Sequence, residues 1–246
     1  MNIITSKANN VVKKAKKLHH KKYRKDSYLI EGWHLFEEAV SNGAELIRIF
    51  ALAEYAERLA DFSQVIFVSP EVLADLADSK TPQGIVAEVA FEREEIPAEL
   101  SGRYLFLEDV QDPGNVGTII RTADAAGFDG VFISQLSADI YNLKTLRSMQ
   151  GSHFHLPVYR IDTADFIRLA RSSSLPILAS TLSSISIDYR EVVSKESFVL
   201  VMGNEGQGIS PEMTAAADIL VHISMKGQAE SLNVAVAAGI LIFHLS

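Results

Sequence analysis

The order of apolar and polar positions predicts alternating strands and helices along the whole chain, with one interruption. The first series predicts strands at residues 27–31, 47–51, 64–68 and 84–91, and helices at residues 33–41, 54–62 and 70–77. Ser69 and Pro70 favour a helix start, because serine caps helices and proline fits their first turn. This series predicts a small α/β domain.

Residues 92–102 are polar and contain Pro97 and Gly102, which interrupt regular structure, so we predict a linker there. A second series follows it. Strands are predicted at residues 104–108, 130–134, near 158, 176–180, 198–202 and 219–223, and helices at 116–126, 141–149, 164–171, after 211 and at 232–245. Such alternation predicts a mostly parallel sheet covered on both faces. We therefore predict two domains, residues 1–97 and 103–246.

Charge is distributed unevenly along a chain whose net charge is −8. Residues 1–25 hold nine bases and no acid, which leaves 14 of the 23 bases against all 31 acids in the remainder. A positive end on an acidic body suits contact with nucleic-acid phosphates, because attraction depends on the local field. The alternative is a solvated, partly frayed helix, and the lysine run alone does not decide between the two.

Composition excludes several kinds of chemistry. The chain has no cysteine, which excludes disulfides, thiolate metal sites and thiol nucleophiles. Any chemistry must therefore use oxygen and nitrogen groups or a bound cofactor, and we expect no metal. No stretch approaches the roughly 20 apolar residues of a membrane span, and the N-terminus lacks the apolar core of a secretory signal. We expect a soluble, cytoplasmic protein with no membrane partner.

Loops that follow the strands are the candidate sites, because parallel sheets bind ligands beyond the carboxyl ends of their strands. The first loop, residues 108–121, passes through a Pro-Gly turn into a helix. A helix N-terminus attracts anions, and Arg121, six positions after Asn115, could add a planar fork for a phosphate. Alternatively, Asn115 only caps the helix, and Arg121 pairs with Asp109 or Asp124.

The second loop, residues 203–211, follows the most apolar strand and is rich in glycine, which lets a backbone approach a ligand closely. It matches neither the dinucleotide fingerprint nor a P-loop. Its Glu205 is either a functional carboxylate or an exposed turn residue.

The third loop joins a strand to an alanine-rich helix over residues 223–238. Ser231 is the predicted cap of this helix. The small residues Ala235, Ala238 and Gly239 permit close packing, either within the domain or against a partner subunit.

Taken together and in this order, the three loops resemble the three motifs of the SpoU-type, TrmH-like class of SPOUT methyltransferases. The matching residues are Asn115 with Arg121, then Asn204-Glu205-Gly206, then Ser231-Leu232-Asn233. Residues 28–32, Tyr-Leu-Ile-Glu-Gly before a helix, resemble the ribosomal-protein-like (L30e-like) α/β substrate-binding domain fused to many of these enzymes. The resemblance implies an RNA-binding domain at residues 1–97 and an α/β-knot, trefoil-knotted SPOUT catalytic domain at residues 103–246. It also implies a homodimer with the active site between subunits.

The activity that the resemblance implies is 2′-O-methylation of a ribose in RNA, with S-adenosyl-L-methionine as methyl donor. Ribosomal RNA, of the 23S kind, is the preferred substrate over transfer RNA, because the N-terminal domain resembles that of ribosomal RNA enzymes. The implied cofactor contacts are Gly203, Ile223 and Leu232, with Thr181 and Leu182 as a further wall. The implied catalytic residues are Arg121, Asn115, Glu205, Ser231 and Asn233.

The roles of these residues follow from their chemistry. A free guanidinium is a very poor base, so we expect Arg121 to hold a phosphate and polarise the 2′-hydroxyl. Asn115 and Asn233 would orient the ribose and backbone, Glu205 would fix Arg121 or its own loop, and Ser231 would cap the last helix beside the substrate.

One position departs from the family pattern, and other functions stay open. Ser224 stands where members often have proline, and we expect a freer cofactor loop because serine does not fix φ. The alternatives are a non-catalytic RNA-binding paralogue and a transfer RNA ribose methyltransferase. A nucleotide-dependent enzyme acting on a small molecule is disfavoured, because both nucleotide fingerprints are missing.

Overall fold

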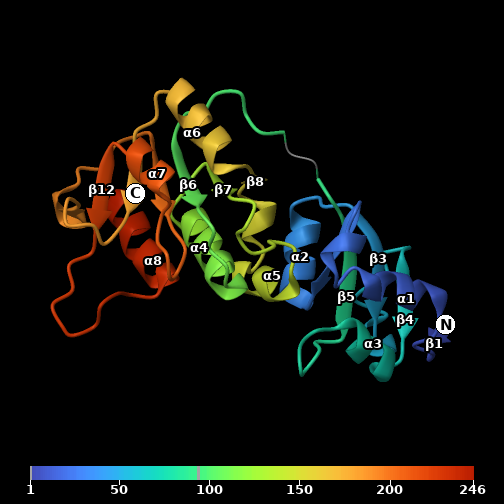
Figure 1. Cartoon of the computed structure of the whole chain (residues 1–246). Helices are drawn as coiled ribbons and strands as arrows, with labels where there is room; N and C mark the ends of the chain where they lie inside the picture. The colour runs from blue at the N-terminus through green and yellow to red at the C-terminus, as the bar shows by residue number, and fades with distance from the viewer. Residues whose placement is uncertain (1, 93–94) are drawn as a thin grey trace. The chain divides into compact units, whose positions relative to one another are not determined.

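The computed structural model describes residues 2–92 and 95–246, which form two compact units (Figure 1). Unit 1 holds the described residues up to 92 together with Tyr141–Phe154. Unit 2 holds the described residues from 95 to 140 together with His155–Ser246. Residues 93 and 94, inside the predicted linker at 92–102, lie outside the described residues.

Unit 1 is built on a five-stranded sheet with the order β1-β4-β3-β5-β2, in which β5 runs antiparallel to both of its neighbours. The predicted strands are all present within one or two residues, and β1 is an additional short strand. The strands are β1 (Ile3–Ile4), β2 (Ser27–Glu31), β3 (Leu46–Ala51), β4 (Val65–Val68) and β5 (Ile85–Ala90). The helices are α1 (Asn10–Lys17), α2 (Trp33–Ser41) and α3 (Pro70–Leu76).

The helix predicted at residues 54–62 is wrong. The segment forms a short 3₁₀ turn, η2 (Ala53–Tyr55), followed by further turns. Its side chains explain the difference, because the guanidinium of Arg58 lies 3.6 Å from the ring centroid of Trp33, and Phe62 packs edge-on against Phe36. Packing against α2 therefore overrides the local helix preference.

The basic N-terminal segment is anchored to the rest of unit 1. Asn9 caps α1 by accepting a hydrogen bond from the amide of Val11, and the fully buried Val12 and Ala15 lie on the face of α1 that packs against α3. Lys16 pairs with Asp75 of α3 at 2.5 Å. Residues 10–17 therefore form a docked helix, not the frayed one considered as an alternative.

Residues 141–154 belong to unit 1, although they come from the second half of the sequence. The segment contains α5 (Leu143–Met149) and η3 (Ser152–Phe154), and α5 contacts β2. Arg147 donates to Asp78 at 2.9 Å and lies 3.6 Å from the buried carboxylate of Glu31. The hydroxyl of Tyr28 lies 3.0 Å from Nε2 of His153. The chain therefore returns to complete unit 1 before it finishes unit 2.

Unit 2 is built on a seven-stranded sheet with the order β10-β12-β9-β11-β6-β7-β8, and every pairing in it is parallel. The predicted mostly parallel sheet is confirmed. The strands are β6 (Arg103–Leu107), β7 (Gly130–Ile133), β8 (Val158–Arg160), β9 (Ile177–Ser180), β10 (Ile187–Asp188), β11 (Phe198–Met202) and β12 (Ile219–His222). The helices are α4 (Pro113–Ala125), α6 (Thr163–Ser172), α7 (Pro211–Ala216) and α8 (Val234–Leu245).

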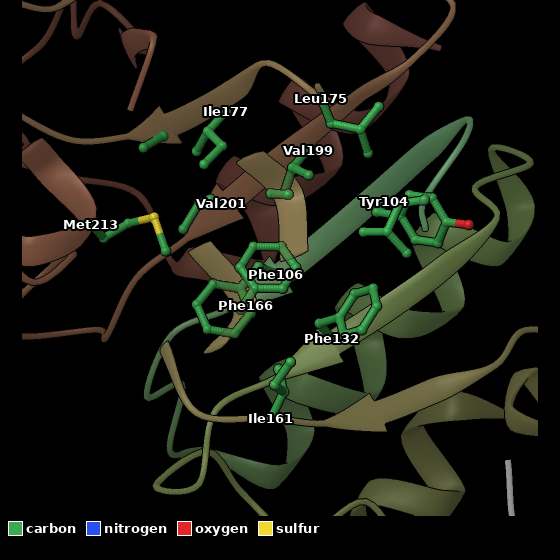
Figure 2. Close-up of a cluster of buried hydrophobic side chains, with 13 residues drawn as sticks. Tyr104, Phe106, Phe132, Ile161, Phe166, Leu175, Ile177, Val199, Val201 and Met213 are labelled. Atoms are coloured by element: carbon green, nitrogen blue, oxygen red, sulfur yellow. The ribbon is translucent and has the colours of Figure 1, made fainter. Parts of the chain in front are cut away.

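The two faces of this sheet are covered by different helices. Alternate strand side chains, among them Phe106, Phe132 and Val201, pack with α6 and α7, as Figure 2 shows. The rings of Phe106 and Phe166 stack at a centroid distance of 4.2 Å. The intervening side chains, such as Leu105 and Leu107, are equally buried, and α4 and α8 pack against each other and against β7 and β11.

Candidate active site

Three of the predicted cofactor contacts emerge from one edge of the seven-stranded sheet. Strands β12, β9 and β11 are adjacent and parallel, and they end at His222, Ser180 and Met202. The residue that follows each strand is Ile223, Thr181 and Gly203, respectively. Since the carboxyl edge of a parallel sheet is where ligands bind, these backbones lie where a cofactor would meet them.

The glycine at position 203 is required by its surroundings. A methyl group there would lie 2.4 Å from the carbonyl carbon of Gly208 and 2.5 Å from the amide nitrogen of Ile209. The loop closes on itself, because the backbones of Asn204 and Gly208 exchange two hydrogen bonds of 2.9 Å. The Asn204 side chain also donates to the carbonyl of Asp109 at 2.8 Å. The second motif is therefore tied to the first.

Glu205 provides the second link between these two motifs. Its Oε2 accepts from the amide of Gln111, and its Oε1 accepts from the amide of Asp112, both at 3.1 Å. Oε1 also accepts from Nδ2 of Asn115 at 3.0 Å. Burial raises the pKa of the Glu205 carboxyl, but these three hydrogen bonds outweigh it and the pKa lies below the ordinary value of 4.5. Glu205 thus holds the loop of the first motif and makes no bond to Arg121.

Asn115 is a helical residue and does not cap its helix. α4 begins at Pro113, three residues earlier than predicted, and Asp112 caps it by accepting from the amide of Asn115 at 3.0 Å. The amide group of Asn115 is therefore available to pair with Glu205. The missed signal was Asp112 itself, because an aspartate before a proline is a strong helix start.

Asn233 joins the third motif to the first. Its Nδ2 donates to Oδ1 of Asn115 at 3.0 Å, and its Oδ1 accepts from the amides of Ala235 and Val236 at 2.9 and 3.3 Å. Asn233 is thus the cap of α8, and the prediction that Ser231 caps this helix is wrong. α8 begins at Val234, and Ser231 is two positions too early to reach its free amides. Among the residues that the structure describes, Ser231 is exposed and makes no hydrogen bond.

Arg121 lies on α4 apart from the cluster formed by Asn115, Glu205 and Asn233. It is exposed and makes no hydrogen bond or ion pair within residues 2–92 and 95–246. The alternative pairing is wrong, because Asp109 bonds to Ser134 and Asp124 contacts His155 at 3.2 Å. The guanidinium of Arg121 is therefore available for an external anion.

Several polar residues that support the site were not predicted. Glu108, only 3% exposed, accepts from the amide of Ser210 at 2.8 Å. Ser137 is also buried, accepting from the amide of Val110 at 3.1 Å and donating to the carbonyl of Leu107 at 2.9 Å. A polar residue at the end of an apolar strand was the available signal for Glu108. The sequence offered none for Ser137, whose role depends on a contact 30 positions away.

The loop after β12 is restrained through its serine. Ser224 donates to Oδ2 of Asp188, and Oδ1 of Asp188 accepts from Nε of Arg190 at 2.7 Å. Hydrogen bonds from the Arg190 side chain first, and then from Ser224, hold the pKa of the Asp188 carboxyl well below its usual range. The expectation of a freer loop did not foresee this tether. Leu182 and Leu232, the remaining predicted cofactor contacts, are 68% and 36% exposed.

Within residues 2–92 and 95–246, no helix is both long and apolar enough to cross a bilayer. In the same ranges, no group of three or more histidine, aspartate or glutamate side chains is arranged to hold a metal ion.

The chain is thus an α/β protein with a candidate ligand site at the carboxyl edge of a parallel sheet, joined to a smaller α/β unit with a basic surface segment. Residues 102–243 match the sequence model of the SpoU rRNA Methylase family, and residues 9–87 match that of the MRM3-like substrate binding domain. The chain belongs to the SpoU rRNA methylase family, as the three motifs predicted.

Known relatives resemble the chain over its full length. It is 39% identical to the 23S rRNA (guanosine(2553)-2′-O)-methyltransferase RlmP of Bacillus subtilis, over 100% of this chain and 99% of that protein. It is 34% identical to an uncharacterized tRNA/rRNA methyltransferase of Synechocystis, over 98% and 92% of the two chains. The crystal structure of an AdoMet-bound rRNA methyltransferase from Sinorhizobium meliloti matches with a TM-score of 0.90 and 33% identity, over 99% and 97%. The predicted fold class and family are confirmed.

Proposed function

We propose that this protein transfers the methyl group of S-adenosyl-L-methionine to a ribose 2′-oxygen in 23S ribosomal RNA. The observation that carries the proposal is the hydrogen-bonded chain from Asn233 through Asn115 to Glu205, which joins all three motifs at one place. The full-length similarity to the Bacillus subtilis enzyme points to the guanosine equivalent to position 2553 as the target. The alternative of a non-catalytic RNA-binding paralogue is disfavoured, because all the motif residues of the family are present.

The cofactor site that we propose is made by backbone and apolar groups. Thr181, Gly203 and Ile223 would line it with backbone at the edge of the sheet, and the exposed side chains of Leu182 and Leu232 would cover an aromatic base. Gly203 lets the backbone of Gly208 and Ile209 pack closely against it, which fixes the loop that would border the cofactor. S-adenosyl-L-methionine, when bound, supplies the electrophilic methyl group.

The protein's own residues would supply position and a route for the proton. Arg121 would hold a phosphate of the RNA and polarise the 2′-hydroxyl, because a guanidinium is always charged and is too poor a base to accept the proton. The proton would pass to that phosphate or another acceptor. Asn115 and Asn233 would orient the ribose, and Glu205, ionised and fully engaged, would keep the first loop in place. Ser231 would contact the RNA from the third loop. Holding the hydroxyl in line with the methyl group accounts for much of the rate.

Two further expectations belong to the same proposal. α8 exposes Val236 and Phe243, which are 52% and 58% exposed, so we propose that a second copy of the chain covers them in a homodimer with the active site between subunits. The knot that the family resemblance implies would be formed by residues 223–246, which return from β12 to pack α8 on α4. The enzyme would act in the cytoplasm, where its RNA is found.

Methyl transfer from radiolabelled S-adenosyl-L-methionine tests the proposal. The acceptors are a 23S rRNA fragment that spans the guanosine equivalent to position 2553, the same fragment with a 2′-deoxy sugar at that nucleotide, and bulk transfer RNA. We expect label only in the first. Arg121→Ala should abolish transfer while binding the cofactor within about twofold of wild type in calorimetry. Label in transfer RNA alone would support the transfer RNA alternative, and cofactor binding without any transfer would support the non-catalytic one.

A further inference from the structure

Tyr23 presents an exposed aromatic ring in the middle of the basic segment. It ends the 3₁₀ turn η1 (Lys21–Tyr23) and is 43% exposed. The ammonium groups of Lys17 and Lys22 lie 5.6 and 5.0 Å from its ring centroid, and the ring of His20 meets it edge-on at 6.4 Å. The exposed ring thus has two ammonium groups lying over it on the surface of unit 1.

The backbone that carries this ring is held firmly. The amide of His20 donates to the carbonyl of Lys17, and the amide of Tyr23 donates to the carbonyl of His20, both at 3.0 Å. Nε2 of His19, the residue before His20, lies within hydrogen-bond distance of the carbonyl of Leu76 at 2.8 Å. Because α1 is also docked on α3, the turn is an extension of an anchored helix, and the ring is offered from a fixed position.

The surroundings of Tyr23 differ from those of other aromatic residues in unit 1. Tyr28 stacks with Phe91 and Tyr141, and Trp33 packs against Phe36 and Tyr55. These rings have clear structural roles. By contrast, the only aromatic neighbour of Tyr23 among the described residues is the exposed His20. The fold therefore needs little from this ring.

The charges around the ring favour an anionic partner. Lys17, Lys21, Lys22 and Lys25 are exposed within eight positions of one another, and Asp26 is the nearest acid along the chain. Lys16, directly before Lys17, is instead paired with Asp75. A flat face beside several cations suits a single-stranded stretch of RNA, in which an unpaired base can stack while the phosphates next to it meet the cations.

We propose that Tyr23 is a stacking platform for one unpaired nucleobase of the RNA substrate, and that Lys17 and Lys22 contact the adjoining phosphates. The inference rests on the proposed function, since it assumes that the substrate is RNA. It adds that unit 1 recognises a loop or bulge of the RNA, because paired bases in a helix offer no free face.

The binding affinity for the 23S rRNA fragment, measured at several salt concentrations, separates stacking from phosphate contact. Tyr23→Ala and Tyr23→Leu should weaken RNA binding about 5- to 150-fold, which is the loss of affinity expected when one base no longer stacks. The dependence of the affinity on salt concentration should stay unchanged. Tyr23→Phe keeps the ring and is the matched control, which should bind like wild type. Lys17→Ala and Lys22→Ala should each flatten the salt slope by about 1.

Three results would overturn the inference. The first is that Tyr23→Ala binds an RNA that the wild-type protein methylates with an affinity within twofold of wild type. This result would leave the proposed function intact. The second is an equal loss of affinity for a fully paired RNA of the same length. The third is a fall in the Tm of Tyr23→Ala and Tyr23→Leu large enough to account for their loss of RNA affinity. Removal of an exposed ring should leave the Tm unchanged. If wild type neither binds nor methylates the fragment, the proposed function fails first.

Discussion

Asn233 donates from Nδ2 to Oδ1 of Asn115 at 3.0 Å, across 118 positions of sequence. The orientation of each amide is fixed by a second bond. Oδ1 of Asn233 is engaged with the first amides of α8, which turns Nδ2 toward Asn115, and Nδ2 of Asn115 donates to Glu205. The N-terminus of α8 thus positions the N-terminus of α4, and Asn115 of α4 is held in turn by Glu205 of the glycine-rich loop.

Replacing Asn233 separates its two roles. Asn233→Asp keeps an oxygen to cap α8 but loses the donor to Asn115, so we expect a Tm near that of wild type and methyl transfer at least about tenfold slower. Asn233→Ala also loses the cap, which costs about 0.5–2 kcal/mol of stability, or several degrees in Tm. Thermal unfolding and initial rates measure the two effects. A fully active Asn233→Asp enzyme would show that the link between the asparagines is only structural.

Gly203→Ala should weaken cofactor binding by more than about tenfold. The added methyl group would overlap the backbone of Gly208 and Ile209, so the loop after β11 must move. Gly206→Ala is the matched control in the same loop, because its methyl group would meet only the side chain of Asn204, at 3.7 Å. Calorimetry with S-adenosyl-L-methionine should show more than about a tenfold loss for the first variant and little change for the second. Equal affinities would remove Gly203 from the proposed site.

The tether between Ser224 and Asp188 predicts a specific pattern of cofactor affinities. Ser224→Ala should weaken cofactor binding about 3- to 10-fold, which is the loss of affinity expected when one partly exposed hydrogen bond to a carboxylate is removed. Ser224→Thr keeps the hydroxyl and should bind like wild type. Adding Ser224→Ala to Asp188→Ala should cause no further loss, because the bond is already gone. Additive losses in this double-mutant cycle would contradict the tether.

The second half of the chain should not be independent of the first. α5 packs in unit 1, where Arg147 approaches the buried Glu31, so a fragment of residues 95–246 would expose the apolar side chains Leu143, Leu146 and Met149. We expect this fragment to aggregate or to bind a dye specific for exposed apolar surface, in contrast to the whole chain. A monodisperse, cofactor-binding fragment with the Tm of the intact protein would contradict this view.

Local patterns were enough to predict most of the elements. The strand β11 and the helix α2 were predicted at their observed bounds, because burial on two faces leaves a continuous apolar run and burial on one face leaves a helical periodicity. Errors arose where a few side chains decide the outcome. The starts of α4 and α8 depend on which residue, Asp112 or Asn233, reaches the free amides, and the turns after β3 depend on packing against α2.

The site was predictable in composition but not in geometry. The motif resemblance indicated Asn115, Glu205 and Asn233, and these three residues do meet. Spacing along the chain could not show that Glu205 binds Asn115 and two amides in place of Arg121. Nor could it show that residues 141–154 pack in unit 1, because a helical pattern identifies an apolar face and not the sheet that receives it.

We propose that this chain methylates a ribose in 23S rRNA and depends on Arg121 to do so. Mapping of 2′-O-methyl sites in total RNA, from cells with and without the gene, tests it most directly. We predict that one site in 23S rRNA, at the guanosine equivalent to position 2553, is lost on deletion. The wild-type gene should restore it and Arg121→Ala should not. An unchanged map after deletion would contradict the proposed activity, and full restoration by Arg121→Ala would contradict the proposed role of Arg121.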